Sequence, residues 1–351
     1  MIKRTSVIFR DEESYCGPIS MLKRLQNEDL LLVFRHAPWD GPDMVSHVHR
    51  NTKTALLRSQ DGGQSWSGLI HPDPDGGNGT TLNQLSDGTL VITNFRWACV
   101  PLENKDSIRH LPGFYENPST GYASAMQGIF ITRSTDNGHS WDIPKAVEVP
   151  GYEGSTTAGR VIDLDGAWLM PMNGAIDGSV DAYSWIAQST DGGETWHFLG
   201  TPERPEDAPR FSENRILHLP DSRILSMVRT PEGNFWKSHS SDAGKTWTPL
   251  EETPLNCRGS SPADLLLLED GRVLCTYGRR RPNPKGVRAS ISEDGGDSWE
   301  PRNEFVLRDD AIATDMGYPS TQTTSDGSLL TIYYWHNEDH IRHLAGTWWA
   351  P

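Results

Sequence analysis

The chain has 351 residues with 33 Gly, 24 Pro and a hydrophobic fraction of 35%, and its net charge is -15. This balance favours many short strands separated by turns over long helices. The negative charge argues against a nucleic-acid-binding surface, and no segment approaches the length of a membrane span. We therefore expect neither a nucleic acid nor a membrane as a partner.

The N-terminal residues and the cysteines bear on the compartment. Residues 1–10 lack the apolar stretch of a signal peptide. The four cysteines show no metal-type spacing, and although an even count permits two disulfides, the missing export signal favours four free thiols. They are Cys16, Cys99, Cys257 and Cys275. The sequence thus predicts a cytoplasmic protein without a metal or other cofactor.

One local pattern, Ser-x-Asp-x-Gly-x-Ser/Thr-Trp, recurs five times at near-regular spacing. Its copies begin at Ser59, Ser134, Ser189, Ser240 and Ser292. The Asp carboxylate can accept hydrogen bonds from its own turn, Gly supplies a positive φ, and Trp can lie between neighbouring sheets. Five copies indicate a repeat fold, in which we expect the Asp and Trp residues to be structural.

Each copy of this pattern follows two strand-like runs and precedes a third, so that one repeat reads as four antiparallel strands, or one propeller blade. The five units cover residues 16–72, 78–147, 155–201, 211–253 and 259–306. A sixth unit runs from Gly317 to the end without the pattern, and Lys3–Arg10 is predicted to supply its outer strand. The sequence predicts an all-β, six-bladed β-propeller of four-stranded antiparallel blades, forming one domain over residues 1–351.

The alternation of strands assigns the faces of this propeller. The Asp patterns join the third and fourth strands of each blade, so they lie on one face, the bottom. The loops between the second and third strands then lie on the top face; the longest, Arg35–Asn51 and Phe95–Gln127, are predicted to be irregular. Carboxylates, arginines, histidines and aromatic residues converge on this face, a composition typical of a sugar-binding site.

These features resemble the sialidase (neuraminidase) superfamily, whose members are six-bladed propellers with such Asp boxes, also called BNR repeats. The run SENRIL from Ser212 opens the fourth blade, SMVR ends at Arg229, and GYPS from Gly317 opens the sixth. The resemblance implies that Tyr318 is the catalytic nucleophile, that Glu213 pairs with it, and that Arg229 belongs to a clamp of three arginines.

The resemblance also assigns the rest of the site, with alternatives. A second clamp arginine is Arg281 or Arg279, and Arg35 is a further candidate for substrate binding. The general acid is Asp40 or Asp43, in the loop that follows Arg35. The first clamp arginine, normally in an (F/Y)RIP motif, is missing, because the matching stretch reads YCGPI. The recognition half of the site is therefore altered, and the sugar need not be sialic acid.

This chemistry explains the residue types. A Tyr is a poor nucleophile at its usual pKa, and a Glu within hydrogen-bond reach can take its proton. Tyr nucleophiles are a recognised exception among glycosidases. Arginines bind a carboxylate in a bidentate manner, and an Asp can protonate the leaving oxygen. His47 and His49 share one face of an extended segment, which suits a metal ion only if a third ligand exists, and otherwise suits ligand contact or acid–base chemistry.

The leading hypothesis is an exo-glycosidase that removes a terminal, acidic sugar from a carbohydrate substrate. A polysaccharide lyase, with His47, His49 or Tyr318 as base, is one alternative, and a non-catalytic glycan-binding propeller is another. Each residue also has a structural interpretation: Glu213 with Arg229 as an ion pair, and Tyr318 as packing. The remaining candidates, Arg279–Arg281, Asp40 and Asp43, would then only form turns.

Overall fold

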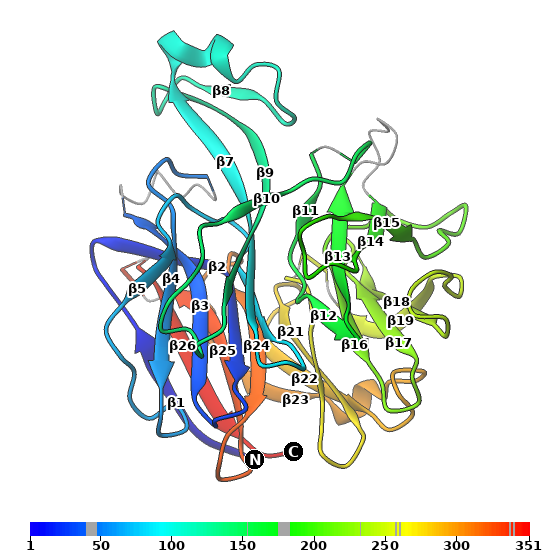
Figure 1. The fold of residues 1–351 in the computed structure, drawn as a ribbon. Coiled ribbons are helices and arrows are strands. Elements are labelled where there is room, and N and C mark those ends of the chain that lie inside the picture. The colour runs from blue at the N-terminus through cyan, green and yellow to red at the C-terminus, as the bar shows by residue number, and fades with distance from the viewer. Residues whose placement is uncertain are drawn as a thin grey trace.

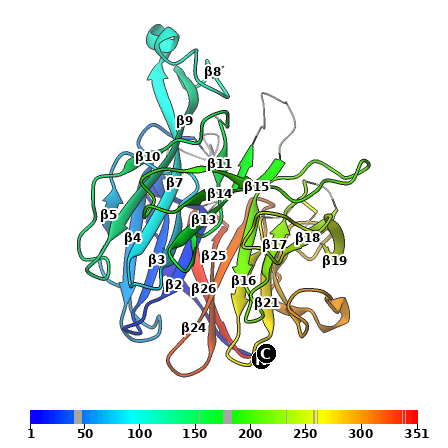
Figure 2. The same cartoon turned by 45° about the vertical axis from the view of Figure 1, so that its right-hand side comes forward.

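The computed structural model describes residues 1–39, 48–152, 154–174, 183–231, 233–256, 258–259, 261–336, 338–339 and 341–351. The chain is a six-bladed β-propeller, because six antiparallel sheets with four strands along each main path surround a common centre (Figures 1 and 2). Two sheets carry one additional short strand each. Within the described residues, no helix is long and apolar enough to cross a membrane.

The first three blades follow one another along the chain, each with its innermost strand first. Blade 1 contains β2 (Ser14–Arg24), β3 (Leu30–Pro38), β4 (Lys53–Ser59) and β5 (Ile70–Asp73). Blade 2 contains β6 (Thr81–Gln84), β7 (Leu90–Pro101), β8 (Tyr115–Asn117), β9 (Tyr122–Ser134) and β10 (Lys145–Val147), with the 3-10 helix η2 (Leu102–Ser107). Blade 3 contains β11 (Thr156–Thr157), β12 (Ile162–Leu164), β13 (Ala167–Gly174), β14 (Tyr183–Ser189) and β15 (His197–Gly200).

The last three blades complete the ring. Blade 4 contains β16 (Asn214–His218), β17 (Ile224–Val228), β18 (Asn234–Ser240) and β19 (Glu251–Asn256). Blade 5 contains β20 (Asp264–Leu267), β21 (Val273–Arg279), β22 (Gly286–Ser292) and β23 (Phe305–Arg308), with the 3-10 helix η3 (Pro301–Asn303). Blade 6 contains β24 (Gly317–Thr323), β25 (Leu329–His336) and β26 (Arg342–Trp349), with β1 (Ile2–Phe9) as its outer strand.

The two ends of the chain meet in this sixth blade. Strand β1 pairs antiparallel with β26, from Ile2 opposite Trp349 to Phe9 opposite Leu344. The N-terminal segment thus occupies the place that the short sixth repeat leaves empty. Pairing of the first strand with the last closes the ring and covers the edge of β26.

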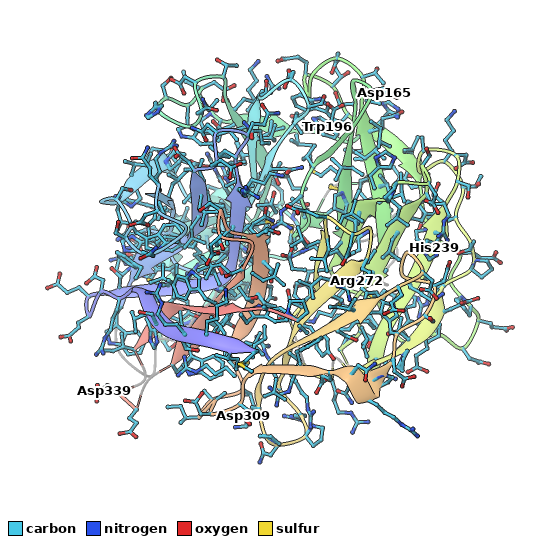
Figure 3. The ribbon with its side chains drawn as sticks, turned by 90° about the horizontal axis from the view of Figure 1, so that it is seen from below. Asp165, Trp196, His239, Arg272, Asp309 and Asp339 are labelled. Carbon is cyan, nitrogen blue, oxygen red and sulfur yellow. The ribbon has the colours of Figure 1, made fainter. Side chains whose placement is uncertain are left out.

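The five Asp boxes form the same hydrogen-bonded turn. In the first box the Asp61 carboxylate accepts from the backbone and the hydroxyl of Ser65, at 2.9 and 2.6 Å. The Trp that ends each box packs between sheets: Trp196 is buried in one apolar cluster with Leu85 and Val91 of blade 2. Figure 3 shows the ring from below and labels Trp196. The structural role predicted for the boxes follows from these local bonds and this packing.

The longest loop predicted on the top face is largely a β-hairpin, so the expectation of an irregular segment over 95–127 was wrong. Strands β7 and β9 continue pairing from Leu90 opposite Ser134 to Pro101 opposite Tyr122. They carry β8 and η2 beyond the propeller body, as the cyan arm of Figure 1 shows. The strand signal was missed because small residues such as Ala, Ser and Cys carry weak alternation.

A partly buried arginine connects four blades through hydrogen bonds. Arg160 of blade 3 donates through Nη2 to the Leu22 carbonyl, at 2.9 Å, and to Ser320 Oγ, at 2.8 Å. Its Nη1 contacts the Asp264 carboxylate of blade 5. Leu22 belongs to blade 1 and Ser320 to blade 6, so one side chain crosses the centre of the ring and fixes the inner strands on which the site depends.

The cysteines are consistent with free thiols where they are described. Cys16 and Cys99 carry free thiols, and Cys16 and Cys275 are buried. Burial raises the pKa of the Cys16 thiol, so this group stays protonated and inert. Cys257 lies outside the described residues.

Candidate active site

Three side chains from blades 4 and 6 meet at the centre of the propeller. Tyr318 lies in β24, whereas Glu213 directly precedes β16 and Arg229 directly follows β17. The Tyr318 hydroxyl donates to Glu213 Oε1 at 2.9 Å. Arg229 Nη1 donates to both Glu213 oxygens, at 3.0 and 2.7 Å, and lies 3.3 Å from the Tyr318 oxygen. The predicted catalytic pair, Tyr318 and Glu213, and the predicted clamp arginine Arg229 are therefore adjacent.

Backbone pairing holds Glu213 and Arg229 opposite each other. The Arg229 N–H donates to the Glu213 carbonyl at 3.0 Å, and the Ser212 N–H donates to the Arg229 carbonyl at 2.9 Å. The ladder of β16 and β17 thus continues past both strand ends. The side chains of Glu213 and Arg229 are 15% and 18% exposed, so both remain partly accessible to solvent.

The charges of the cluster set the protonation of Glu213 and Tyr318. Burial alone would raise the pKa of Glu213, but the Arg229 guanidinium and the Ser212 hydroxyl, 2.6 Å away, lower it to about 2. Burial and the Glu213 carboxylate raise the pKa of Tyr318. At neutral pH a neutral phenol therefore donates to an ionised carboxylate, which is the ground state that general-base activation requires.

Tyr318 also has an unusual backbone conformation. Its φ is 47°, in the left-handed region that non-glycine residues rarely adopt, and it follows Gly317, whose φ is 111°. Residues held in such conformations cost free energy and cluster at functional sites. The twisted start of β24 orients the phenol toward blade 4, because the pairing between β24 and β25 shifts register between Gly317 and Ser320.

The arginine run that begins with the last residue of β21 contributes one side chain to this centre, and it is neither of the two favoured by the sequence. The Arg280 guanidinium lies 5.9 Å from the Tyr318 ring centre, and it donates to the Met316 carbonyl at 2.9 Å and to the Tyr334 hydroxyl at 2.8 Å. Arg279 instead donates to Glu304 at 3.3 Å. Arg281 is exposed. Consecutive residues of an extended chain face opposite sides, so only one of the first two can face the centre.

Arg35 lies at the centre but is fully buried. It donates to Asn78 at 3.0 Å and to the Gly17 carbonyl at 3.2 Å, and its guanidinium lies 4.9 Å from the Tyr15 ring centre. Tyr15 begins the YCGPI stretch that replaces the (F/Y)RIP motif. Arg342 of β26 covers the same ring at 4.2 Å, so two arginines flank Tyr15 where the family pattern has one arginine.

A buried network that the sequence did not reveal joins these groups. The Asp315 carboxylate accepts from Arg342 Nη2 at 2.6 Å and from the Tyr334 hydroxyl, and it lies 3.6 Å from Arg280 Nη2. Asp315 stands three residues before Tyr318, and this proximity in sequence is the one signal that could have identified it. No local pattern identifies Arg342 or Tyr334, because blade packing alone brings them to the centre.

The remaining candidates fall in or next to a segment outside the described residues. Asp40, Asp43 and His47 lie within 40–47, which the structure does not describe. His49 Nδ1 accepts a hydrogen bond from the Asn51 N–H at 3.0 Å, so the neutral ring carries its proton on Nε2. Across the described ranges, no group of three or more His, Cys, Asp or Glu side chains is arranged to hold a metal ion.

Comparison with known proteins identifies the family of this chain. The BNR repeat-like domain family matches residues 96–331. A sialidase of Clostridium perfringens is 27% identical over 252 residues, covering 66% of this chain and 60% of the relative. A sialidase of Bacteroides fragilis is 25% identical over 330 residues, covering 86% and 56%. The chain belongs to the BNR repeat-like family of the sialidase superfamily, and it spans about 60% of the length of these curated relatives.

Solved structures agree on the fold. A protein of unknown function from Dyadobacter fermentans has a TM-score of 0.85 at 25% identity, covering 99% of this chain and 98% of that one. The NanB sialidase of Streptococcus pneumoniae has a TM-score of 0.67 at 14% identity, covering 97% and 70%. At this low identity, the likeness to NanB shows the shared propeller and leaves the chemistry to the site itself.

Proposed function

We propose that the chain is an exo-acting glycoside hydrolase that removes a terminal acidic sugar. The observation that carries the proposal is the 2.9 Å hydrogen bond from the Tyr318 hydroxyl to Glu213, with Arg229 bonded to both. A neutral phenol on an ionised carboxylate is an activated nucleophile whose base is already in place. The distant sialidase relatives support this class of reaction.

The proposed reaction has two displacements. Glu213 takes the phenolic proton while the Tyr318 oxygen attacks the anomeric carbon, and Arg229 stabilises the negative charge that develops on that oxygen. The bond to the leaving oxygen breaks as Asp40 or Asp43 protonates it. The same Asp, now ionised, then takes a proton from a water molecule, whose oxygen attacks the anomeric carbon. The C–O bond to Tyr318 breaks, Glu213 returns its proton to the phenolate oxygen, and the sugar is released.

The preference for an acidic sugar rests on the local charge. Arg229, Arg280 and Arg342 stand close to Tyr318 or to the network beside it, against the carboxylates of Glu213 and Asp315. Counted with Arg35, four cations face two carboxylates in a chain whose overall charge is -15. Such a positive centre suits an anionic ligand. Arg342 already forms an ion pair with Asp315. We therefore expect the acidic group of the sugar to make other contacts than it would with three arginines that have no carboxylate partner.

The test is an assay of purified protein on aryl glycosides, including sialosides and uronides, beside the Tyr318→Phe variant. Tyr277 provides a matched control, because its hydroxyl donates to Glu304 at 2.6 Å and takes no part in the Tyr318 cluster. We expect release of the aglycone by the wild type and by Tyr277→Phe, with a loss of at least about 10³-fold in Tyr318→Phe. Equal rates in both variants would contradict the role of Tyr318.

Two other outcomes would replace the proposal. An ultraviolet-absorbing product from an acidic polysaccharide, without release of any aglycone, would identify a lyase. Binding of glycans with no turnover in either assay would identify a non-catalytic propeller. In the second case, Tyr318→Phe would change affinity but no rate.

A further inference from the structure

The outer part of the β7–β9 arm is a small three-stranded sheet with two unlike faces. Ser124 of β9 pairs with Tyr115 of β8 on one side and with Cys99 of β7 on the other, and Tyr122 pairs with Asn117. Cross-strand partners, and residues two apart on a strand, share a face. One face therefore carries five polar or aromatic side chains, namely Cys99, Tyr115, Asn117, Tyr122 and Ser124.

The opposite face of the arm is apolar and has its own cover. Ala123 and Ala125 of β9 are buried in a cluster with Ile108, and Phe114 and Leu111 pack against this cluster. The loop between η2 and β8 thus provides the small core that stabilises the arm. Since the arm obtains its stability from this face, the polar and aromatic face is left for another role.

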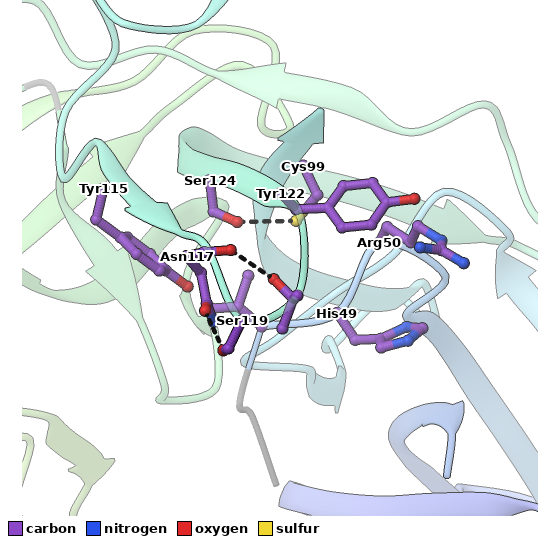
Figure 4. A pocket seen from close by; sticks show the side chains of 10 residues that line it. His49, Arg50, Cys99, Tyr115, Asn117, Ser119, Tyr122 and Ser124 are labelled. Carbon is purple, nitrogen blue, oxygen red and sulfur yellow. Dashed lines mark hydrogen bonds between the residues drawn. The ribbon is translucent and has the colours of Figure 1, made fainter. Parts of the chain in front are cut away.

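The polar and aromatic face bounds a pocket of about 400 Å³ against blade 1 (Figure 4). Val48, His49 and Arg50 form the blade 1 side, and Ser119 and Thr120 of the β8–β9 turn complete the lining. This volume lies within the range of roughly 300–1,000 Å³ that small-molecule sites occupy. The pocket is separate from the Tyr318 cluster, because none of its lining residues belongs to that cluster.

The lining has the composition of a carbohydrate site. It offers two tyrosine rings, three hydroxyl side chains, one amide and the Arg50 guanidinium, and none of the described lining residues is acidic although the chain has 47 Asp and Glu. Aromatic rings pack against the C–H faces of sugars, while hydroxyl and amide groups both donate to and accept from sugar hydroxyls. The absence of carboxylates among these residues and the presence of Arg50 favour a neutral or anionic ligand over a cationic one.

The two rings are held by neighbouring side chains. Trp97 of β7 lies edge-on to the Tyr115 ring, with ring centres 5.9 Å apart. The Arg50 guanidinium lies 4.6 Å from the Tyr122 ring centre. Binding surfaces that are ordered before the ligand arrives lose less entropy on binding. The tyrosines are thus preorganised as side walls.

Hydrogen bonds connect this pocket to the central site. Arg35 Nη2 donates to Thr52 Oγ1 at 3.2 Å, and Thr52 Oγ1 donates to the His49 carbonyl at 2.8 Å. Arg35 is the buried arginine that flanks Tyr15, and His49 lines the pocket. The Thr52 side chain therefore connects the pocket residue His49 to Arg35 at the centre of the ring.

We infer that the pocket between the arm and blade 1 is a second carbohydrate-binding site, which holds neutral or anionic sugar units on the leaving-group side of the substrate. Its role as a leaving-group site rests on the proposed hydrolase function. A glycan whose terminal sugar lies at Tyr318 would extend into this pocket, and Tyr115 and Tyr122 would select for the sugars that follow.

Binding is measured first, because it does not depend on catalysis. Wild type, Tyr318→Phe, Tyr122→Ala, Tyr115→Ala and Glu103→Ala are applied to an array of neutral and acidic oligosaccharides, with far-ultraviolet circular dichroism as a check of folding. Glu103 is a matched control, because it is exposed on η2 of the same arm and does not line the pocket. We expect a glycan to be retained by wild type, Tyr318→Phe and Glu103→Ala, and lost in the two alanine variants of tyrosine.

Kinetics then test the leaving-group role. The kcat/KM of Tyr122→Ala is compared on an aryl glycoside and on an oligosaccharide that carries the same terminal sugar. We expect a fall on the order of tenfold for the oligosaccharide, the factor typical of one lost packing contact, and none for the aryl glycoside. An equal fall for both substrates would overturn the leaving-group role.

The array separates this inference from the proposed function. Retention of a glycan that disappears in Tyr122→Ala, in a protein that hydrolyses nothing, would support the binding site and overturn its leaving-group role together with the hydrolase. An array on which the wild type retains no oligosaccharide, or retention that survives both alanine variants, would overturn the binding site itself.

Discussion

Two tyrosine–glutamate–arginine clusters in this propeller have the same chemical groups and unlike surroundings. At the centre, Tyr318 donates to Glu213, which Arg229 also contacts. In blade 5, Tyr277 donates to Glu304 at 2.6 Å, and the same carboxylate accepts from Arg279 at 3.3 Å. Burial raises the pKa of both phenols. Neither the residue types nor the hydrogen bonds distinguish a candidate nucleophile from a structural tyrosine.

What differs is the architecture around the two clusters. The central one joins the first strands of two blades across 105 residues of sequence, whereas the other lies within one blade across 27. Tyr318 has a positive φ, and Tyr277 is not among the residues with one. The first cluster lies beside Arg280 and the network of Arg342, whereas the Glu304 carboxylate forms ion pairs with Arg279 and Arg288 of its own blade. We infer that the position on the inner strands, and the strained backbone at Tyr318, distinguish the proposed catalytic pair from the structural one.

The largest expected effect is on kcat, and it should separate Glu213 from the structural Glu304. Glu213→Gln keeps the shape of the side chain but removes the base, so kcat should fall by about 10²- to 10⁴-fold, the usual contribution of general-base catalysis. Glu304→Gln makes the same change in blade 5 and should leave kcat within a factor of about two. Steady-state rates on the responding aryl glycoside measure both. A comparable loss in the two variants would abolish the distinction between the clusters.

The next effect is on stability, and it concerns the close approach that the central cluster requires. Gly17 has a φ of 94°, and a Cβ at this position would lie 2.7 Å from the Tyr334 ring. Gly17→Ala should therefore lower the free energy of unfolding by on the order of 2 kcal/mol or more, from backbone strain and steric overlap. Gly68→Ala is the matched control, because no atom lies within 4 Å of the added carbon. Urea unfolding of both variants measures the difference; equal midpoints would show that blades 1 and 6 separate easily here.

Much of the fold could be predicted from the sequence because its repeat is local. Each Asp box satisfies its own turn, so the pattern around Asp61 or Asp136 specifies a hairpin without help from distant residues. The pairing of Glu213 with Tyr318 is not local, and it was predictable only through the resemblance of their flanking motifs. Its geometry depends on six blades closing into a ring, which no single segment encodes.

The rest of the site could not be predicted, for physical reasons that differ by residue. The sequence favoured Arg281 and Arg279 over Arg280. Which of these side chains faces the centre depends on where the regular alternation of β21 ends, and the sequence does not show that point. Asp315 and Arg342 belong to one network only because two segments of blade 6 pack together. The arm was taken for a loop because its small residues alternate weakly.

A smaller effect on rate should separate the two neighbouring arginines. Arg280→Lys removes the planar fork that bonds the Met316 carbonyl and the Tyr334 hydroxyl, so kcat/KM for an acidic sugar should fall on the order of tenfold, mainly through KM. Arg279→Lys alters only the Glu304 cluster and should leave kcat/KM unchanged. Initial rates over a range of substrate concentrations distinguish these outcomes. Similar values for the two variants would assign the recognition of the acidic group elsewhere.

The effect confined to the narrowest range of conditions is the dependence of stability on pH, and it isolates the charge of Glu213. Its carboxyl has a pKa of about 2 in the folded protein against an ordinary value of 4.5. Below about pH 4.5 this carboxyl is protonated in the unfolded chain, whereas in the folded protein it stays ionised down to about pH 2. The stabilisation is therefore complete above about pH 4.5 and is lost as the pH falls toward 2.

Urea unfolding of wild type and Glu213→Gln at several values between pH 2 and pH 7 measures this contribution. Other carboxylates with a lowered pKa, such as Asp61 of the first box, act equally in both proteins, so the difference between the curves belongs to Glu213. We expect the free energies of unfolding to differ most near neutral pH and to converge toward pH 2. Parallel curves would mean that Arg229 does not hold Glu213 in its charged form, and the phenol of Tyr318 would then lack an ionised base.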